Sequence, residues 1–268
     1  MKAIIPVAGW GTRRLPITKS IEKCMLPIGN RPIVDYVVED CIKAGINDII
    51  FVVGEQSTQI QNYYGRNIML EDYLISVEKP NLLDEILPPR NVTFHYVTQP
   101  QNGKYGTAIP VALAAEAYDC SPGAVVLMGD DFIYHPDSSS EVARLIKCAG
   151  SDSALLGVKV PDSETSKYGV LQIDSEGRFE QIVEKPVAGE APSNLINVSK
   201  YVMNPTLLSE VVAYSHENHE GEYYITEPIN RYTQAGGVLN VLEAAGQYLD
   251  GGTLEGWLEA NQTVLSME

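Results

Sequence analysis

Several protein classes are excluded by what this sequence of 268 residues lacks. Its four cysteines are widely spread and form no Cys-x-x-Cys pair, which argues against zinc sites and dithiol redox motifs. No apolar run approaches the roughly 18–20 residues that cross a bilayer, and there is no internal repeat or low-complexity tract. Free thiols fit a reducing compartment, so we expect a cytoplasmic protein that does not interact with membranes.

Basic residues are also scarce, with 19 Lys and Arg against 35 Asp and Glu and a formal net charge of −16. Because an acidic chain repels phosphate backbones at long range, we expect no nucleic-acid partner. The beginning of the chain is the exception, because residues 1–23 hold a single acidic residue and five basic ones: Lys2, Arg13, Arg14, Lys19 and Lys23. This cluster favours a small anionic ligand, although a chance cluster on a solvated loop is the alternative.

The first half of the chain alternates between two kinds of pattern. Short apolar runs predict buried strands at 3–8, 49–53, 92–97 and 124–128, and helical spacing predicts helices at 32–45 and 107–118. This alternation is typical of an α/β fold with a Rossmann-like, mainly parallel or mixed central sheet and helices on both faces. Ligands of such sheets bind beyond the carboxyl ends of the strands, so the loops after Ala8 and Met128 should share one crevice.

The rest of the chain departs from this alternation. Residues 65–90 are too long for a simple loop and predict a helical insertion. The second half predicts strands at 168–173, 179–183, 195–203 and 238–242, and helices after Pro205, at 226–236 and at 253–264. No linker divides the chain, so we expect a single domain over residues 1–268.

The strongest local signal is the glycine-rich stretch Gly9-Trp10-Gly11-Thr12-Arg13 after the first strand. Such a turn lets backbone N–H groups approach a phosphate chain, and the planar fork of Arg13 matches phosphate oxygens. Lys23 can add a point charge at the same place. The stretch lacks the Gly-Lys-Ser/Thr ending of a P-loop and the third glycine of the dinucleotide fingerprint, which disfavours a Rossmann-type oxidoreductase. A tight turn without function is the alternative for any Gly-x-Gly pair.

The longer stretch from Gly9 to Pro27 resembles the signature of the nucleotidyltransferases that make nucleoside-diphosphate sugars, roughly G-x-G-T-R-x-x-P followed by K-x-x-L-P. The resemblance covers nearly the whole chain. Further blocks in the family's order and spacing are Gln99-Pro100 with Lys104-Tyr105-Gly106-Thr107-Ala108, Gly129-Asp130-Asp131, Tyr168-Gly169-Val170, Glu184-Lys185-Pro186 and Asp250-Gly251-Gly252-Thr253. It implies a nucleotide-binding half at about 1–130 and a sugar-phosphate-binding half at about 131–268.

The stretches at 5–9, 18–19, 82–86 and 191–195 fit one branch of this family. By these stretches the chain most resembles the bacterial-type branch that transfers a uridylyl group from UTP to glucose 1-phosphate. It departs from that branch at Glu22-Lys23-Cys24, where Pro-Lys-Glu is usual, and at 104–108, where a Gly-Leu-Gly-His-Ala run is usual. The block at 250–253 is closer to the thymidylyl- and adenylyltransferase branches. Thymidylyl transfer from dTTP therefore stays open as an alternative, as does a catalytically silent sensor of sugar nucleotides.

The resemblance implies a reaction in which the phosphate of a sugar 1-phosphate attacks the α-phosphorus of a nucleoside triphosphate and pyrophosphate leaves. This reaction needs positioning and charge neutralisation more than acid–base groups. Arg13 and Lys23 then serve as catalytic cations on the triphosphate, and Gln99 and Gly106 read the base edge. The remaining nucleotide contacts are Ala8, Gly9, Gly11 and Thr12.

The second half supplies the implied sugar-phosphate contacts, which are Gly169, Glu184, Lys185 and Asn194. Glu184 would bind sugar hydroxyls and Lys185 the sugar's phosphate; an exposed surface ion pair is the alternative for these two. The resemblance also implies a homo-oligomer.

Two aspartates are the candidate metal ligands. Asp130 follows a buried strand, where an isolated carboxylate would be costly unless a hard divalent cation offsets its charge. Asp250 occupies a second strand-to-turn position far away in the sequence. The resemblance implies that the two hold Mg²⁺ against the reacting phosphates, whereas a turn-forming or capping aspartate is the alternative for each. The neighbouring Asp131 either points away or contacts the sugar.

Overall fold

The computed structural model describes residues 1–175 and 178–267. In this part of the chain the central sheet is mixed and contains nine strands. Its parallel portion has the spatial order β6-β1-β4-β5, formed by Ala124–Leu127, Lys2–Pro6, Asp48–Gly54 and Thr93–Gln99. Each of these strands matches a predicted one to within a few residues, but β5, which was predicted to be buried, is an edge strand without a fully buried residue.

The second half of the chain extends the same sheet with antiparallel strands. β11 (Leu195–Met203) pairs with β6 and continues the sheet to β9 (Gly169–Ile173) and β10 (Phe179–Glu184). β8 (Ser153–Lys159), which the sequence patterns did not reveal, also pairs with β11 and carries β12 (Leu239–Glu243) in parallel register. One sheet therefore joins both halves of the chain; their functional division stays a prediction.

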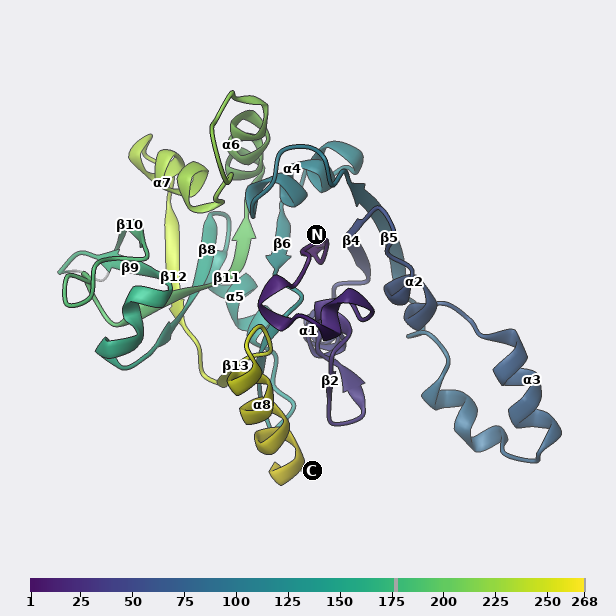
Figure 1. Ribbon diagram of the computed structural model, residues 1–268. Helices are drawn as coiled ribbons and strands as arrows, with labels where there is room; N and C mark the ends of the chain where they lie inside the picture. Colours follow the sequence, from purple (N-terminus) through teal and green to yellow (C-terminus); the bar gives the residue numbers. More distant parts are fainter. Residues whose placement is uncertain (176–177, 268) are drawn as a thin grey trace.

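Helices cover both faces of the sheet, as expected (Figure 1). Side chains alternate between faces along a strand, so Ala3 and Ile5 of β1 belong to one buried cluster and Ile4 to the other. The first cluster includes side chains of α1 (Ile33–Lys43) and α5 (Glu141–Ala149). The second is covered by α4 (Ala108–Ala117), α6 (Pro205–His216) and α7 (Thr226–Gln234).

Helical structure occupies the predicted insertion at 65–90. α3 (Ile68–Ser76) and the 3-10 segment η4 (Pro80–Glu85) follow the short helix α2 (Gln59–Tyr64). Figure 1 shows this arm projecting away from the sheet, and Met69 on it is 85% exposed. Among the described helices none is long and apolar enough to cross a membrane.

A second, smaller sheet lies beside the crevice. β7 (Asp131–Tyr134) pairs antiparallel with β13 (Gln247–Asp250), which places Asp250 opposite Asp131. The chain then turns into the closing helix α8 (Leu254–Met267). This pairing brings the two candidate metal-binding segments together although about half of the chain separates them in sequence.

Candidate active site

A cavity of about 670 Å³ opens at the carboxyl ends of the parallel strands. The loops that follow β1 and β6 both line it, so the predicted shared crevice is present. The lining includes the following predicted residues: Ala8, Gly9, Gly11, Thr12, Arg13, Lys23, Gln99, Gly106 and Asp130. Asp250, Gly169, Glu184, Lys185 and Asn194 do not line this cavity. The first three lie on β13, β9 and β10, while Lys185 directly follows β10 and Asn194 directly precedes β11.

The conformation of the glycine-rich loop depends on Gly11. Its φ of 64° is left-handed, and a Cβ atom there would lie only 2.9 Å from Cγ2 of Thr18 and 3.1 Å from Cβ of Lys23. The carbonyl oxygen of Gly11 accepts hydrogen bonds from Oγ1 of Thr18 at 2.9 Å and from the backbone N–H of Arg14 at 2.8 Å. Glycine is thus required for both backbone conformation and space, and the loop that presents Arg13 is fixed in place.

Lys23 and Asp130 form an ion pair at the edge of the cavity, with 2.6 Å between Nζ and Oδ2. Burial acts to lower the pKa of Lys23, but the adjacent carboxylate outweighs burial and the pKa is raised. Burial likewise acts to raise the pKa of Asp130, yet the charges of Lys23 and Lys200 outweigh it and the pKa is lowered. Both groups are therefore charged at neutral pH.

The turn after Asp250 meets Asp130 directly. The backbone N–H of Gly251 donates to the carbonyl oxygen of Asp130 at 3.0 Å, and the N–H of Gly252 donates to Oδ1 of Asp250 at 2.7 Å. A Cβ atom on Gly252 would lie 2.8 Å from Oδ1 of Asp250, 3.3 Å from Oδ2 of Asp130 and 3.3 Å from Nη2 of Arg13. The two carboxylates and the guanidinium therefore converge on one spot.

This pair of carboxylates fits a magnesium ion that takes its other ligands from substrate and water. Burial and the charge of Asp130 raise the pKa of Asp250, although the N–H of Gly252 opposes them, so a cation beside it would relieve repulsion. Mg²⁺ is usually held by one or two carboxylates together with phosphates and water. The described residues include no group of three or more His, Cys, Asp or Glu side chains that could hold a metal ion.

Asp131 faces the opposite way from Asp130 and is 8% exposed. Its carboxylate pairs with the buried ammonium of Lys200 and accepts a hydrogen bond of 3.0 Å from the hydroxyl of Tyr248. Burial and the charge of Asp130 raise the pKa of Asp131 to about 6, despite the opposing effect of Lys200. Of the two alternatives for Asp131, the structure shows the one in which it points away from the crevice and supports β7 and β13.

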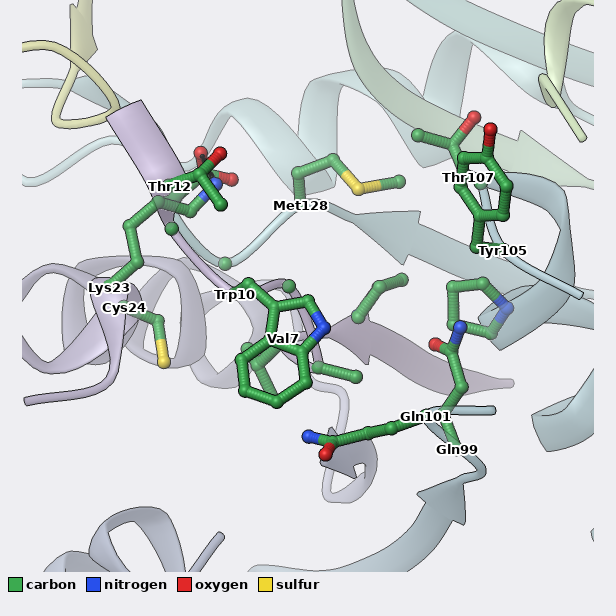
Figure 2. Close-up of a pocket in the computed structure, with 18 of the residues that line it drawn as sticks. Val7, Trp10, Thr12, Lys23, Cys24, Gln99, Gln101, Tyr105, Thr107 and Met128 are labelled. Carbon is green, nitrogen blue, oxygen red and sulfur yellow. Dashed lines mark ion pairs between the residues drawn. The ribbon is translucent and has the colours of Figure 1, made fainter. Parts of the chain in front are cut away.

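The other end of the cavity presents amide and aromatic side chains. Gln99 ends β5, and Gly106 has a φ of 118°. A Cβ atom on Gly106 would lie 2.5 Å from the backbone N of Tyr223, which donates to the carbonyl oxygen of Tyr105 at 2.9 Å. Figure 2 shows Thr12 and Lys23 on one side of the pocket, Gln99, Gln101 and Tyr105 on the other, and Trp10 between them. A charged end and an end with amide and aromatic side chains suit a nucleotide.

Comparison with known proteins agrees with this geometry. The sequence model of a family described as nucleotidyl transferase matches residues 2–267. The chain belongs to that family. The UTP–glucose-1-phosphate uridylyltransferase of Bacillus subtilis is 34% identical over 242 residues, covering 87% of this chain and 80% of the relative.

Solved structures resemble this nucleotidyltransferase over its whole length. A UTP-bound UGPase from Acinetobacter baumannii has a TM-score of 0.87 and 30% identity, covering 98% of this chain and 92% of the other. A UDP-glucose pyrophosphorylase complexed with UDP-glucose has a TM-score of 0.80 and 28% identity, covering 100% of this chain and 99% of the other. The family and the fold inferred from the sequence blocks are confirmed.

The structure brings together three of the four predicted sugar-phosphate residues of this nucleotidyltransferase. Glu184 pairs with Gly169 in the β9–β10 register, and a Cβ atom on Gly169 would lie 2.9 Å from Oε2 of Glu184. Partial desolvation raises the pKa of Glu184, with Lys185 opposing it. Lys185 adopts a φ of 43°, and its backbone N–H donates to the carbonyl oxygen of Tyr168 at 3.0 Å.

Asn194 lies apart from this group. Ile196 of β11 pairs antiparallel with Val170, so the register carries Asn197 toward Gly169 and carries Asn194 away from it. The side chain of Asn194 is exposed, and its backbone oxygen accepts the N–H of Val160 at 3.0 Å. A residue-by-residue match to a family block cannot reveal this, because strand register depends on partners elsewhere in the chain.

Glu222 is a lining residue of the nucleotidyltransferase cavity to which the sequence patterns gave no role. The bridge between Tyr223 and the Tyr105–Ala108 segment brings it there, over a separation of more than a hundred residues. Gln101 follows one predicted block and Tyr105 belongs to the next, and both line the cavity. Their proximity to Gln99 and Gly106 in sequence was a usable signal, and for Glu222 the signal was the similarity of residues 222–227 to a family region that begins a helix near the crevice.

Proposed function

We propose that this nucleotidyltransferase transfers the uridylyl group of UTP to glucose 1-phosphate and so forms UDP-glucose and pyrophosphate. The observation that carries the proposal is the convergence of Arg13, Asp130 and Asp250 around Gly252, at the edge of a cavity whose far end holds Gln99. The names of the relatives support the choice of UTP and glucose 1-phosphate.

In the proposed reaction an oxygen of the sugar's phosphate attacks the α-phosphorus of UTP. The bond from the α-phosphorus to the oxygen that bridges it to the β-phosphorus breaks, and pyrophosphate leaves with that oxygen. Arg13 and Lys23 neutralise the charge that accumulates on the departing pyrophosphate. The sugar phosphate is itself the nucleophile, so the protein needs to align two anions rather than supply an attacking group.

Asp130 and Asp250 are the proposed magnesium ligands. When bound, the ion neutralises phosphate charge and polarises the α-phosphoryl group. Asp130 already presents a charged carboxylate because Lys23 lowers its pKa together with Lys200. Glu184 and Lys185 would orient the sugar and its phosphate from the end of the neighbouring strand β10.

Gln99 is the proposed base-reading residue, since its amide offers both a donor and an acceptor to the imide edge of a pyrimidine. Uracil and thymine share that edge and differ by one methyl group, which is worth only about 1–3 kcal/mol in an apolar pocket. The preference for UTP over dTTP therefore rests on the relatives rather than on Gln99.

Product analysis tests the proposal. The protein is incubated with UTP, MgCl₂ and a panel of sugar 1-phosphates, and the products are separated by anion-exchange chromatography. We expect UDP-glucose as the main product with glucose 1-phosphate. A different nucleotide sugar would correct the substrate, and no product with any sugar would favour the sensor alternative.

We also propose a homo-oligomer. Sedimentation velocity over a range of protein concentrations tests it: we expect a single species larger than 29.4 kDa, and a monomer at all concentrations would contradict it.

A further inference from the structure

Arg13 and Arg14 are consecutive in sequence, yet their side chains lie in different surroundings. Arg13 lines the cavity, whereas Arg14 is only 7% exposed. Nη1 of Arg14 donates hydrogen bonds to the carbonyl oxygens of Gly251 at 3.0 Å and Thr253 at 2.7 Å. Arg14 therefore links the glycine-rich loop to the turn after Asp250 across almost the whole sequence.

The two carbonyl groups that Arg14 holds flank Gly252. That residue is the point on which the carboxylates of Asp130 and Asp250 and the guanidinium of Arg13 converge. A small displacement of the turn would move Oδ1 of Asp250 relative to Oδ2 of Asp130, because the N–H of Gly252 is itself bonded to Asp250 at 2.7 Å. Arg14 thus acts on the backbone that sets the spacing of the two carboxylates.

The guanidinium is fixed from its other side by helix α8. Its central carbon lies 5.3 Å from the ring centroid of Trp257, and Nε1 of Trp257 donates to the carbonyl oxygen of Pro27 at 2.7 Å. Figure 1 shows α8 beside the short strand β2 (Pro27–Ile28). The stacking ring is therefore held by a hydrogen bond to the N-terminal segment that carries Arg14.

Burying the guanidinium of Arg14 beside Trp257 carries a desolvation penalty. Burial lowers the pKa of Arg14, and the charges of Asp250 and Glu255 only partly oppose that effect. An apolar side chain could pack on Trp257 without a desolvation penalty, so packing alone does not account for arginine here. Its distinctive contributions are two hydrogen bonds from one nitrogen and a positive charge near Asp250.

We propose that Arg14 is a positioning residue that holds the Gly251–Thr253 turn against the glycine-rich loop and so sets Asp250 and Asp130 at the spacing needed to share one magnesium ion. The inference rests on the proposed function. Groups that orient metal ligands from behind typically contribute about 10- to 100-fold to metal affinity, and we expect Arg14→Met to weaken metal binding within that range.

The test measures Mn²⁺ binding by electron paramagnetic resonance in the presence of UTP, beside UTP affinity in EDTA and thermal unfolding. Arg31→Met is the matched control, because Arg31 also lies over an aromatic ring, 4.5 Å from the centroid of Tyr36, and pairs with Asp35 at 2.8 Å. We expect Arg14→Met to weaken Mn²⁺ binding while UTP affinity in EDTA is retained. Arg31→Met should lower the unfolding temperature and leave Mn²⁺ affinity unchanged.

Arg14→Lys keeps the charge but shortens the reach and loses the planar stack, so we expect a smaller loss of Mn²⁺ affinity than with methionine. It also provides the measurement if Arg14→Met does not fold. Wild-type Mn²⁺ affinity in a folded Arg14 variant, or an equal loss in Arg31→Met, would overturn the proposal. Failure of the wild-type protein to form UDP-glucose would instead contradict the proposed function.

Discussion

Nζ of Lys23 lies 2.6 Å from Oδ2 of Asp130, so a proposed triphosphate ligand and a proposed metal ligand are paired with each other. The ammonium offsets the charge of a carboxylate that is followed in sequence by a second one, Asp131. The oxygens of a bound triphosphate would offer the ammonium of Lys23 an alternative partner. If Lys23 paired with them instead, Oδ2 of Asp130 would be free to bind a metal ion. In the proposed reaction the pair would therefore link binding of the nucleotide to exposure of the proposed metal ligand.

Asp130→Asn should reduce turnover by at least about 100-fold, since loss of a ligand should cost no less than loss of its supporting groups. The fold should survive. Removing the carboxylate leaves burial as the main influence on Lys23, so the pKa of Lys23 should fall from its raised value. Pyrophosphate release and ¹⁵N-detected titration of Lys23 check these two outcomes. Normal turnover would remove Asp130 from the metal site, and an unchanged pKa would contradict the pairing.

Lys185→Ala should act on the sugar phosphate and spare the nucleotide. Loss of a hydrogen bond to a charged group, about 1.5–3 kcal/mol, should raise the KM for glucose 1-phosphate about 10- to 100-fold. Steady-state kinetics with each substrate varied in turn give the comparison. Lys43→Ala is the control, because Lys43 pairs with Glu39 at 2.9 Å on α1, away from all of the proposed site residues. Equal effects of Lys185→Ala on the KM for glucose 1-phosphate and the KM for UTP would contradict the proposed contact of Lys185 with the sugar phosphate.

Asp131→Asn should destabilise the protein by about 3–5 kcal/mol, because it leaves the buried ammonium of Lys200 without its carboxylate. Adding Lys200→Met should recover part of this loss. Urea unfolding of the wild type, both single variants and the double variant gives the coupling free energy. Strict additivity of the two single effects would show that the pair does not act as a unit.

Gly106→Ala should lower stability by about 1–3 kcal/mol through backbone strain and additionally push the Tyr223 segment away from the cavity. The KM for UTP should rise as well, since Gly106 and Glu222 both line the cavity. Gly189→Ala is the matched control, because Gly189 is also left-handed, with a φ of 85°, but a Cβ atom there would meet nothing within 4 Å. If the control raises the KM for UTP equally, the close approach to Tyr223 is not the cause.

Features that depend on a short stretch of sequence were predicted from that stretch. Apolar runs located the parallel strands, and the glycine-rich stretch located the loop that presents Arg13. Helix α5 was missed although its signal was present: the side chain of Ser140 caps it through Ala143 at 3.0 Å, and Val142 and Leu145 are spaced for one buried face.

Other features have no local signal. The pairing of β7 with β13 and the burial of Asp131 against Lys200 depend on residues far apart in sequence. The displacement of Asn194 from Glu184 depends on the register of β11, which neighbouring strands determine. The contact of Arg14 with the turn after Asp250 has no local signal either, because two consecutive arginines look alike in sequence until the directions of their side chains are known.

The most direct test of nucleotidyl transfer is pyrophosphate release with glucose 1-phosphate and MgCl₂, measured in parallel with UTP, dTTP, ATP and CTP. We expect turnover that requires the metal and is fastest with UTP. Faster turnover with dTTP would keep the roles of Arg13, Lys23, Asp130 and Asp250 but contradict the assigned nucleotide. Absence of pyrophosphate with all four nucleotides would contradict the central claim that these residues perform nucleotidyl transfer to glucose 1-phosphate.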